Sequence, residues 1–166
     1  MKVFKEEQRF TQTWLIVLLA FSLIVPIVII IKEIMTEDII VSIKQNIVII
    51  FALIIAITPI FFFKLTTRID EKGVYYQFFP FHFSLKLISW NEISKAYIRT
   101  YNPISDYGGW GLKGGWSKSK GKALNVSGDI GMQLVLKNGK KLLIGTKKSD
   151  EIKQVLKTYL NKLEND

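Results

Sequence analysis

The residues best suited to binding chemistry lie in one segment, from Tyr101 to Lys122. It contains six glycines, two tryptophans, two tyrosines and four lysines. Tryptophan rings favour the boundary between water and lipid, and each lysine contributes about 1 kcal/mol of attraction near an anionic lipid surface. The candidate residues for binding lipid or a partner are Tyr107, Trp110, Lys113, Trp116, Lys118 and Lys120.

Two interpretations of this segment remain open. A loop of this length inside a compact domain is usually functional or disordered. In the functional interpretation, residues 102–122 form a flexible clasp whose tryptophans enter the interface or stack on a ligand, while the lysines meet lipid phosphates or an acidic partner. In the structural interpretation, the segment is a long hairpin whose glycines satisfy turns and whose tryptophans fold back onto a sheet.

Other motifs in the chain are weak signals for chemistry. Residues 109–114 match G-x-G-x-x-G, but a dinucleotide site needs this motif between a strand and a helix, and no helical pattern follows it. His82 is the only histidine and the chain has no cysteine, so one chain offers neither a usual catalytic triad nor a multi-histidine metal site. We therefore expect no catalytic, cofactor-binding or metal-binding residues, and no enzyme.

Two long apolar stretches predict the elements that position this segment. They run from Phe10 to Ile31 and from Gln45 to Phe63, and neither contains a charged side chain. A helix over either stretch is about as long as the ~30 Å hydrocarbon core of a bilayer is thick. We expect a two-span hairpin over residues 1–64, with spans at about 11–31 and 46–63. Without buried charges, the spans resemble anchors and not a conduit.

The charges around the spans predict their orientation. Residues 1–9 carry three basic side chains, and Lys64, Arg68 and Lys72 follow the second span, whereas residues 32–44 carry two basic and three acidic side chains. Loops rich in lysine and arginine stay cytoplasmic. We expect a multi-pass protein of the cell (plasma or inner) membrane with both termini in the cytoplasm. Residues 32–44 are then expected outside, as a connector that forms a helical extension, an interfacial turn or a short hairpin.

Residues 65–166 are predicted to form one mainly-β domain. Alternating apolar residues and turn signals predict seven antiparallel strands, over residues 65–70, 74–79, 84–90, 93–101, 123–127, 130–136 and 140–145. Asn138-Gly139 is a strong hairpin signal. After Ser149, apolar residues recur with helical spacing from Ile152 to Leu163, so one amphipathic helix is expected to cap a curved sheet or barrel.

This order of elements resembles a bacterial pleckstrin-homology-like (PH-like) domain. The similar runs are I-D-E-K-G-V at residues 69–74, I-S-W-N-E-I at 88–93 and G-M-Q-L-V-L at 131–136, with the Gly/Trp segment and L-I-G-T adding to these. E-E-Q-R-F-T-Q-T-W, at residues 6–14, resembles the start of small two-span bacterial membrane proteins that carry such a domain. Phosphoinositide-binding PH domains have basic residues around the first hairpin, but here that turn has two acids and one base.

The resemblance implies a non-catalytic, membrane-anchored binding or scaffold module at the inner leaflet. Its expected partners are the anionic lipid bilayer, a peptide, a membrane protein or a second copy of the chain. Lysine-rich runs beside a membrane anchor are explained by anionic lipid, so nucleic acid is not an expected partner. The alternative is an accessory subunit of a membrane transporter or enzyme complex. An enzyme would have to build its site from Asp, Glu, Lys and Tyr alone.

Overall fold

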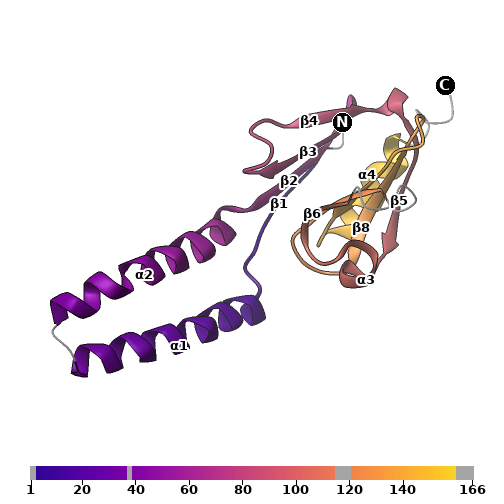
Figure 1. The fold of residues 1–166 in the computed structure, drawn as a ribbon. Helices are drawn as coiled ribbons and strands as arrows, with labels where there is room; N and C mark the ends of the chain where they lie inside the picture. Colours follow the sequence, from indigo (N-terminus) through magenta and orange to yellow (C-terminus); the bar gives the residue numbers. More distant parts are fainter. Residues whose placement is uncertain (1–2, 37–38, 115–120, 160–166) are drawn as a thin grey trace. The chain divides into compact units, whose positions relative to one another are not determined.

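The chain forms two compact units (Figure 1). The computed structural model describes residues 3–36, 39–114 and 121–159. One unit, the helical unit, comprises Phe10–Phe62. The other, the β-domain, comprises Met1–Arg9 together with Phe63–Asp166. The expected division at residue 64 therefore misses one feature, because the first residues of the chain belong to the β-domain.

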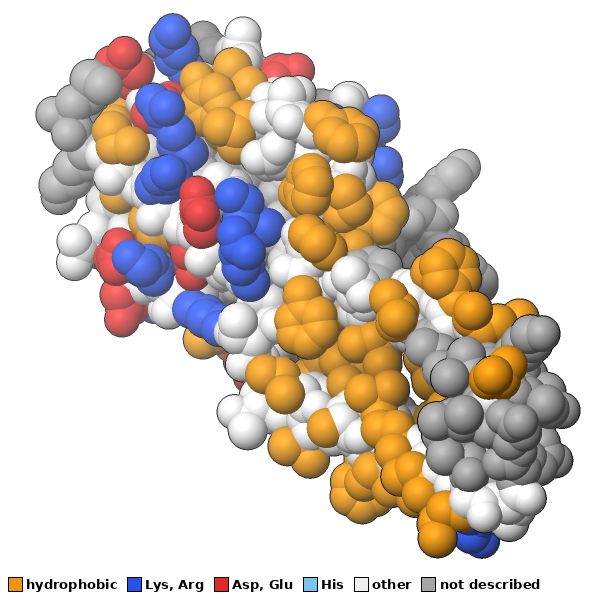
Figure 2. All heavy atoms as spheres, turned by 90° about the vertical axis from the view of Figure 1, so that its left-hand side faces the viewer, with side chains coloured by type: hydrophobic (Ala, Val, Ile, Leu, Met, Phe, Trp, Pro, Cys, Tyr) orange, Lys and Arg blue, Asp and Glu red, His pale blue; other side chains and the backbone are white. Residues whose placement is uncertain are grey.

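The helical unit contains two apolar helices of 24 residues each, α1 (Thr13–Thr36) and α2 (Ile39–Phe62). Within the described ranges, one segment, Thr13–Glu33, is long and apolar enough to cross a membrane, and none of its most apolar window is buried. The apolar segment of α2, Asn46–Phe62, is shorter. On the face that Figure 2 shows, charged side chains gather in one region, and apolar side chains are prominent in the rest of the described surface. The second expected span stays a prediction.

Of the three forms expected for the connector, the described residues favour a helical extension. Helix α1 continues past the first predicted span to Thr36, and α2 begins at Ile39, before the second. The side-chain amide of Asn46 on α2 donates a hydrogen bond to the carboxylate of Glu33 on α1. This contact gives the buried Asn46 amide a partner inside the second apolar stretch, as a buried amide requires.

The first sheet of the β-domain, sheet A, is a four-stranded antiparallel meander in the order β1-β2-β3-β4. Its strands are β1 (Phe4–Arg9), β2 (Lys64–Ile69), β3 (Gly73–Phe79) and β4 (Lys86–Ser89). Strand β1 was not predicted, although Phe4, Glu6 and Gln8 alternate with exposed residues in the pattern of a half-buried strand. The whole helical unit is thus inserted between two neighbouring strands, β1 and β2.

The second sheet, sheet B, has five strands in the order β5-β8-β9-β7-β6. They are β5 (Ile93–Thr100), β6 (Gly111–Gly114), β7 (Lys122–Asn125), β8 (Ile130–Leu136) and β9 (Lys141–Gly145). The expectation of a wholly antiparallel arrangement is wrong at one pair, because β7 and β9 are parallel. The Asn138-Gly139 turn makes β8 and β9 antiparallel. The short connection from β7 to β8 also reverses the chain direction. Strand β7 therefore runs parallel to β9 when it pairs with the free edge of β9.

The main core lies between the inner faces of the two sheets and helix α4 (Ser149–Tyr159), which contacts β1, β5 and β8. Trp90, in a single 3₁₀ turn between the sheets, stacks on Tyr159 at 5.5 Å between ring centroids. Its indole N–H donates to the carbonyl of Asp70 at 2.9 Å. The fully buried large side chains include Leu65, Ile69, Phe78, Ile93, Leu124, Met132, Leu134, Leu143, Ile144 and Ile152. Burial of these side chains is the main source of stability for the β-domain.

Two polar side chains of β1 tie the beginning of the chain to the segment before α4. The buried carboxylate of Glu6 accepts hydrogen bonds from the Thr146 hydroxyl at 2.6 Å and from the Lys147 backbone N–H at 2.9 Å. The side-chain amide of Gln8 donates to the carbonyl of Gly145 at 2.8 Å. Hydrogen bonds to a charged group are stronger than neutral ones, and losing a buried partner is costly. Strand β1 therefore links sheet A to the end of sheet B.

Replacement of Glu6 should destabilise the β-domain far more than replacement of its neighbour Glu7. Glu6→Ala leaves the Thr146 hydroxyl and the Lys147 N–H without their acceptor, which should lower the free energy of unfolding by about 1–3 kcal/mol. Glu7 is half-exposed and forms ion pairs with Lys5 and Lys64 at 3.5 and 3.6 Å, so Glu7→Ala should cost under about 1 kcal/mol. Chemical unfolding of the full chain in detergent, followed by tryptophan fluorescence, measures both. Equal losses for the two variants would contradict this role of Glu6.

Candidate functional site

The described part of the Gly/Trp segment contains a short helix that was not predicted and a strand that belongs to a hairpin, as the structural interpretation expects. Helix α3 (Pro103–Tyr107) is a short turn, and β6 pairs with β7 as an antiparallel hairpin. The side chain of Asn102 caps α3 by accepting from the backbone N–H groups of Ile104 and Ser105, both at 3.0 Å. The pair Asn102-Pro103 is a recognisable helix start, an N-cap residue followed by proline at the first helical position, and could have revealed α3.

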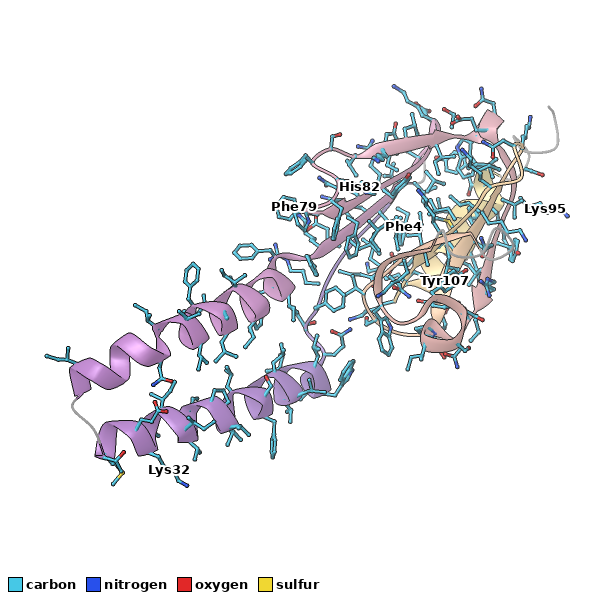
Figure 3. The ribbon with its side chains drawn as sticks, viewed as in Figure 1. Phe4, Lys32, Phe79, His82, Lys95 and Tyr107 are labelled. Atoms are coloured by element: carbon cyan, nitrogen blue, oxygen red, sulfur yellow. The ribbon has the colours of Figure 1, made fainter. Side chains whose placement is uncertain are left out.

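Tyr107, predicted to contact lipid or a partner, is a core residue of the β-domain. It packs with Tyr101, Ala123 and Leu143 against the outer face of sheet B, and only 9% of its surface is exposed. Arg99 donates to the Tyr107 hydroxyl at 2.9 Å. Tyr107 therefore contributes to internal packing (Figure 3), and its contact with lipid or a partner stays a prediction.

The remaining candidate residues divide by position. Trp110 is half-buried, and its indole N–H donates to the carbonyl of Gly128 at 3.1 Å, so this ring folds back onto the domain. Lys113 is half-buried on β6. Trp116, Lys118 and Lys120 lie outside the described residues. The contacts of the described residues therefore agree with the hairpin interpretation, while a binding role for the other three remains a prediction.

A groove of about 600 Å³ between the two sheets is a stronger candidate site. It lies between β3 and β4 of sheet A and β7, β9 and the β8–β9 turn of sheet B, whereas α4 contacts the other strands β1, β5 and β8. Its volume is in the range of small-molecule sites. The lining residues are Tyr76, Ile88, Gly121, Lys122, Leu136, Asn138, Gly139, Lys140, Lys141 and Leu142.

The groove combines an apolar interior with a cationic border. Ile88 and Leu142 are buried, and three lysines, Lys122, Lys140 and Lys141, line the same space without any lining aspartate or glutamate. Within the described residues, no ion pair joins Lys122 or Lys140 to an acid. This arrangement favours a ligand that has one apolar and one anionic part.

Tyr76 connects the groove to the single histidine. Its ring meets the His82 ring edge-on at 5.6 Å between centroids. Burial raises the pKa of Tyr76, so its phenol stays a neutral hydrogen-bond donor. Partial burial lowers the pKa of His82, and Lys86 and Lys122 lower it further by repulsion of the imidazolium. Two lysines therefore contribute positive potential at this end of the groove.

The described residues contain no group of three or more His, Asp or Glu side chains that could hold a metal ion. The lysine, tyrosine and aliphatic side chains of the groove offer charge and shape recognition. None of its lining residues was among the predicted site residues. Only the hairpin signal at Asn138-Gly139 pointed to one of its walls, because the groove joins residues of β3 and β4 with residues of β7, β8 and β9, which lie far from them in sequence.

The stability of the β-domain should decrease as the pH falls below about 6.5. The Nδ1 atom of His82 accepts a hydrogen bond from the Phe78 N–H at 3.2 Å, which requires the unprotonated ring. Because the folded pKa lies below the unfolded value of about 6.5, His82 contributes full stability above that pH and loses it as the pH falls through the folded pKa. NMR titration of the one ¹³C-labelled histidine ring in the detergent-solubilised chain gives the folded pKa directly. A folded pKa at or above 6.5 would contradict the environment described for His82.

Thermal unfolding of the His82→Gln variant should show a weaker pH dependence in the same range than thermal unfolding of the natural chain.

Comparison of the chain with protein-family models, with curated proteins and with solved structures finds no match. The resemblance to PH-like membrane proteins therefore stays a prediction from sequence, and function must be argued from the geometry of this chain.

Proposed function

We propose that this protein is a non-catalytic, membrane-anchored binding module with a PH-like β-domain at the inner leaflet. In this proposal α1 and α2 cross the membrane as a hairpin, and the groove between the sheets binds an anionic lipid. The apolar part of the lipid contacts the aliphatic interior, and its headgroup meets the lysines. The helices contribute anchorage, and the β-domain contributes recognition.

The observation that carries the membrane arrangement is the insertion of the apolar helices between β1 and β2. Arg9, at the end of β1, is the cross-strand partner of Lys64, at the start of β2. Directly opposed residues of an antiparallel pair lie within about 5.5 Å of each other between Cα atoms. An insertion whose two ends are fixed side by side must leave and return on the same side of a membrane. The β1–β2 pair therefore favours an even number of crossings over a single one, and two crossings are the simplest such arrangement.

The orientation is inferred from the basic residues at this junction. Arg9 and Lys64 flank the insertion, while the connector between α1 and α2 carries more acids than bases. Basic residues near the ends of spans remain cytoplasmic, which favours an inner-leaflet position for the β-domain. The cytoplasmic leaflet is also the anionic one, so the lysines of the groove would meet negative headgroups there.

The choice of an anionic lipid is supported by the groove's lining. An apolar wall alone would suit many ligands, but three lysines without a lining acid disfavour a cationic or neutral one. Lys122 begins β7, Lys140 lies in the β8–β9 turn and Lys141 begins β9. Because β7 and β9 are adjacent strands, the three lysines lie close together on the sheet B side of the groove. A charged headgroup with several oxygen acceptors can interact with all of them.

Single cysteines should report the proposed topology, because the natural chain has none. Met35→Cys lies at the exposed end of α1, and Gln154→Cys lies on the exposed side of α4. A membrane-impermeant maleimide added to intact cells should label the first variant and spare the second until the membrane is permeabilised. Labelling of Gln154→Cys in intact cells would contradict the cytoplasmic position. Protection of both sites in intact cells would contradict the double crossing.

Replacement of two groove lysines should weaken lipid retention. Each lysine contributes about 1 kcal/mol near anionic headgroups, so Lys122→Gln with Lys140→Gln should reduce affinity roughly 30-fold. Native mass spectrometry of the full chain in detergent, titrated with phosphatidylglycerol, measures the bound fraction and also reveals any protein partner. Lys153→Gln with Lys157→Gln on α4 is the charge-matched control. Equal losses for the two double variants would reject the groove as the site, and a stoichiometric protein partner with no bound lipid would favour an accessory subunit.

A further inference from the structure

We propose that the β3–β4 loop, residues 80–85, inserts its aromatic side chains into the interface of the bilayer. This inference rests on the proposed membrane location and adds a second membrane contact, made by the β-domain itself. We call residues 80–85 the aromatic loop. Its sequence, P-F-H-F-S-L, places two phenylalanines and one leucine around the single histidine.

The aromatic loop exposes far more apolar surface than a free water-soluble domain would favour. Phe83 is 84% exposed and Phe81 57%, and Leu85 and the following Leu87 are also exposed. Four large apolar side chains within seven residues form a local apolar surface, which on soluble proteins marks an interaction site. The other large apolar side chains exposed on the described β-domain are Val3, Tyr97, Ile104 and Leu112, which come from separate elements.

The exposed rings are held in place by a hydrogen-bonded loop. The N–H of His82 donates to the carbonyl of Phe78 at 2.9 Å, and the N–H of Phe78 donates back to His82 Nδ1 at 3.2 Å. The Gln77 side chain donates to the carbonyl of His82 at 3.1 Å. These three bonds close the turn on the end of β3 (Figure 3). The loop thus presents its apolar side chains in a preformed arrangement, which lowers the entropic cost of binding.

Contacts with neighbouring aromatic rings support both exposed phenylalanines, Phe81 and Phe83. Phe81 stacks on Phe78 at 6.0 Å and contacts Phe63 at 5.8 Å between centroids, and Phe83 meets Phe79 edge-on at 6.2 Å. One side of each ring therefore has an aromatic neighbour, while most of the Phe83 surface still faces solvent. Packing inside the domain leaves this surface uncovered.

The position of the loop in sheet A identifies the bilayer as its partner. Phe79, the last residue of β3, is the cross-strand partner of Lys64. Lys64 is itself paired with Arg9, and these two residues are where the chain continues into the apolar helices. The aromatic loop therefore leaves sheet A at the same end as both connections to the membrane anchor. A surface of aromatic and leucine residues beside lysines is the combination that binds the lipid interface.

The loop's environment can be measured in the full chain with a spin label on a single cysteine. Phe83→Cys, Leu18→Cys on α1 and Gln154→Cys on α4 are labelled and reconstituted in nanodiscs that contain phosphatidylglycerol. Power saturation compares collisions with oxygen, which concentrates in lipid, and with a nickel chelate, which stays in water. We expect oxygen collisions to dominate at residues 18 and 83 and nickel collisions to dominate at residue 154.

The three labels separate this inference from the proposed function. A lipid-exposed residue 18 with a water-exposed residue 83 would overturn loop insertion and leave the anchored module intact. A water-exposed residue 18 would overturn the membrane arrangement itself. Exclusion of both probes from residue 83 would instead show that a protein surface covers the loop, and would also reject insertion.

A second set of variants tests whether the phenylalanines cause insertion. A label at Leu85→Cys should lose most of its lipid exposure when Phe81→Ser and Phe83→Ser are added. The matched control adds Tyr97→Ser and Ile104→Ser, which remove exposed apolar side chains elsewhere on the β-domain, and should leave the label unchanged. Circular dichroism confirms that each variant keeps its sheets. Unchanged lipid exposure in the Phe81/Phe83 variant would overturn the role of these rings.

Discussion

The antiparallel pairing of β1 with β2 is the constraint on which the rest of the structure depends. It joins residues on either side of the helical unit, so the ends of both apolar helices are fixed beside each other at Arg9 and Lys64. The same strand carries Glu6 and Gln8, which bind the segment between β9 and α4. A short N-terminal strand therefore completes sheet A, connects it to sheet B and limits how the apolar helices can meet a membrane.

The two-sheet arrangement separates the covered core from the proposed recognition site. Where α4 contacts β1, β5 and β8, Trp90 and Tyr159 stack and the core is covered. Between β3, β4, β7 and β9, no helix of the described residues lines the space, and lysines border an apolar groove. Charged side chains are stable at such an opening because their ends remain hydrated while their stems contact aliphatic surface. The aromatic loop adds a different surface, since its rings have little polar cover and gain from contact with lipid.

The Gly/Trp segment illustrates the limit of composition as a guide to function. Its glycines, tyrosines and tryptophans suggested an exposed clasp, but Tyr107 and Trp110 fold back onto the β-domain. Gly114 of this segment allows β6 and β7 to approach closely, because a Cβ there would lie 2.6 Å from the Lys122 Cα. Conversely, Phe81 and Phe83 were not among the predicted site residues, and only their exposure in the structure distinguishes them from core residues.

Local patterns in the sequence determined much of the secondary structure. Apolar length predicted the positions of α1 and α2, alternation predicted β2, β3, β5, β8 and β9, and Asn138-Gly139 predicted the last hairpin, because these signals depend on residues close together in the chain. Only the tertiary structure decided the pairing of β1 with β2, the parallel pairing of β7 with β9 and the burial of Tyr107. The groove and the exposed end of sheet A also required it. These features depend on contacts between residues far apart in sequence, and the periodicity of one segment contains no information about which distant segment will lie beside it.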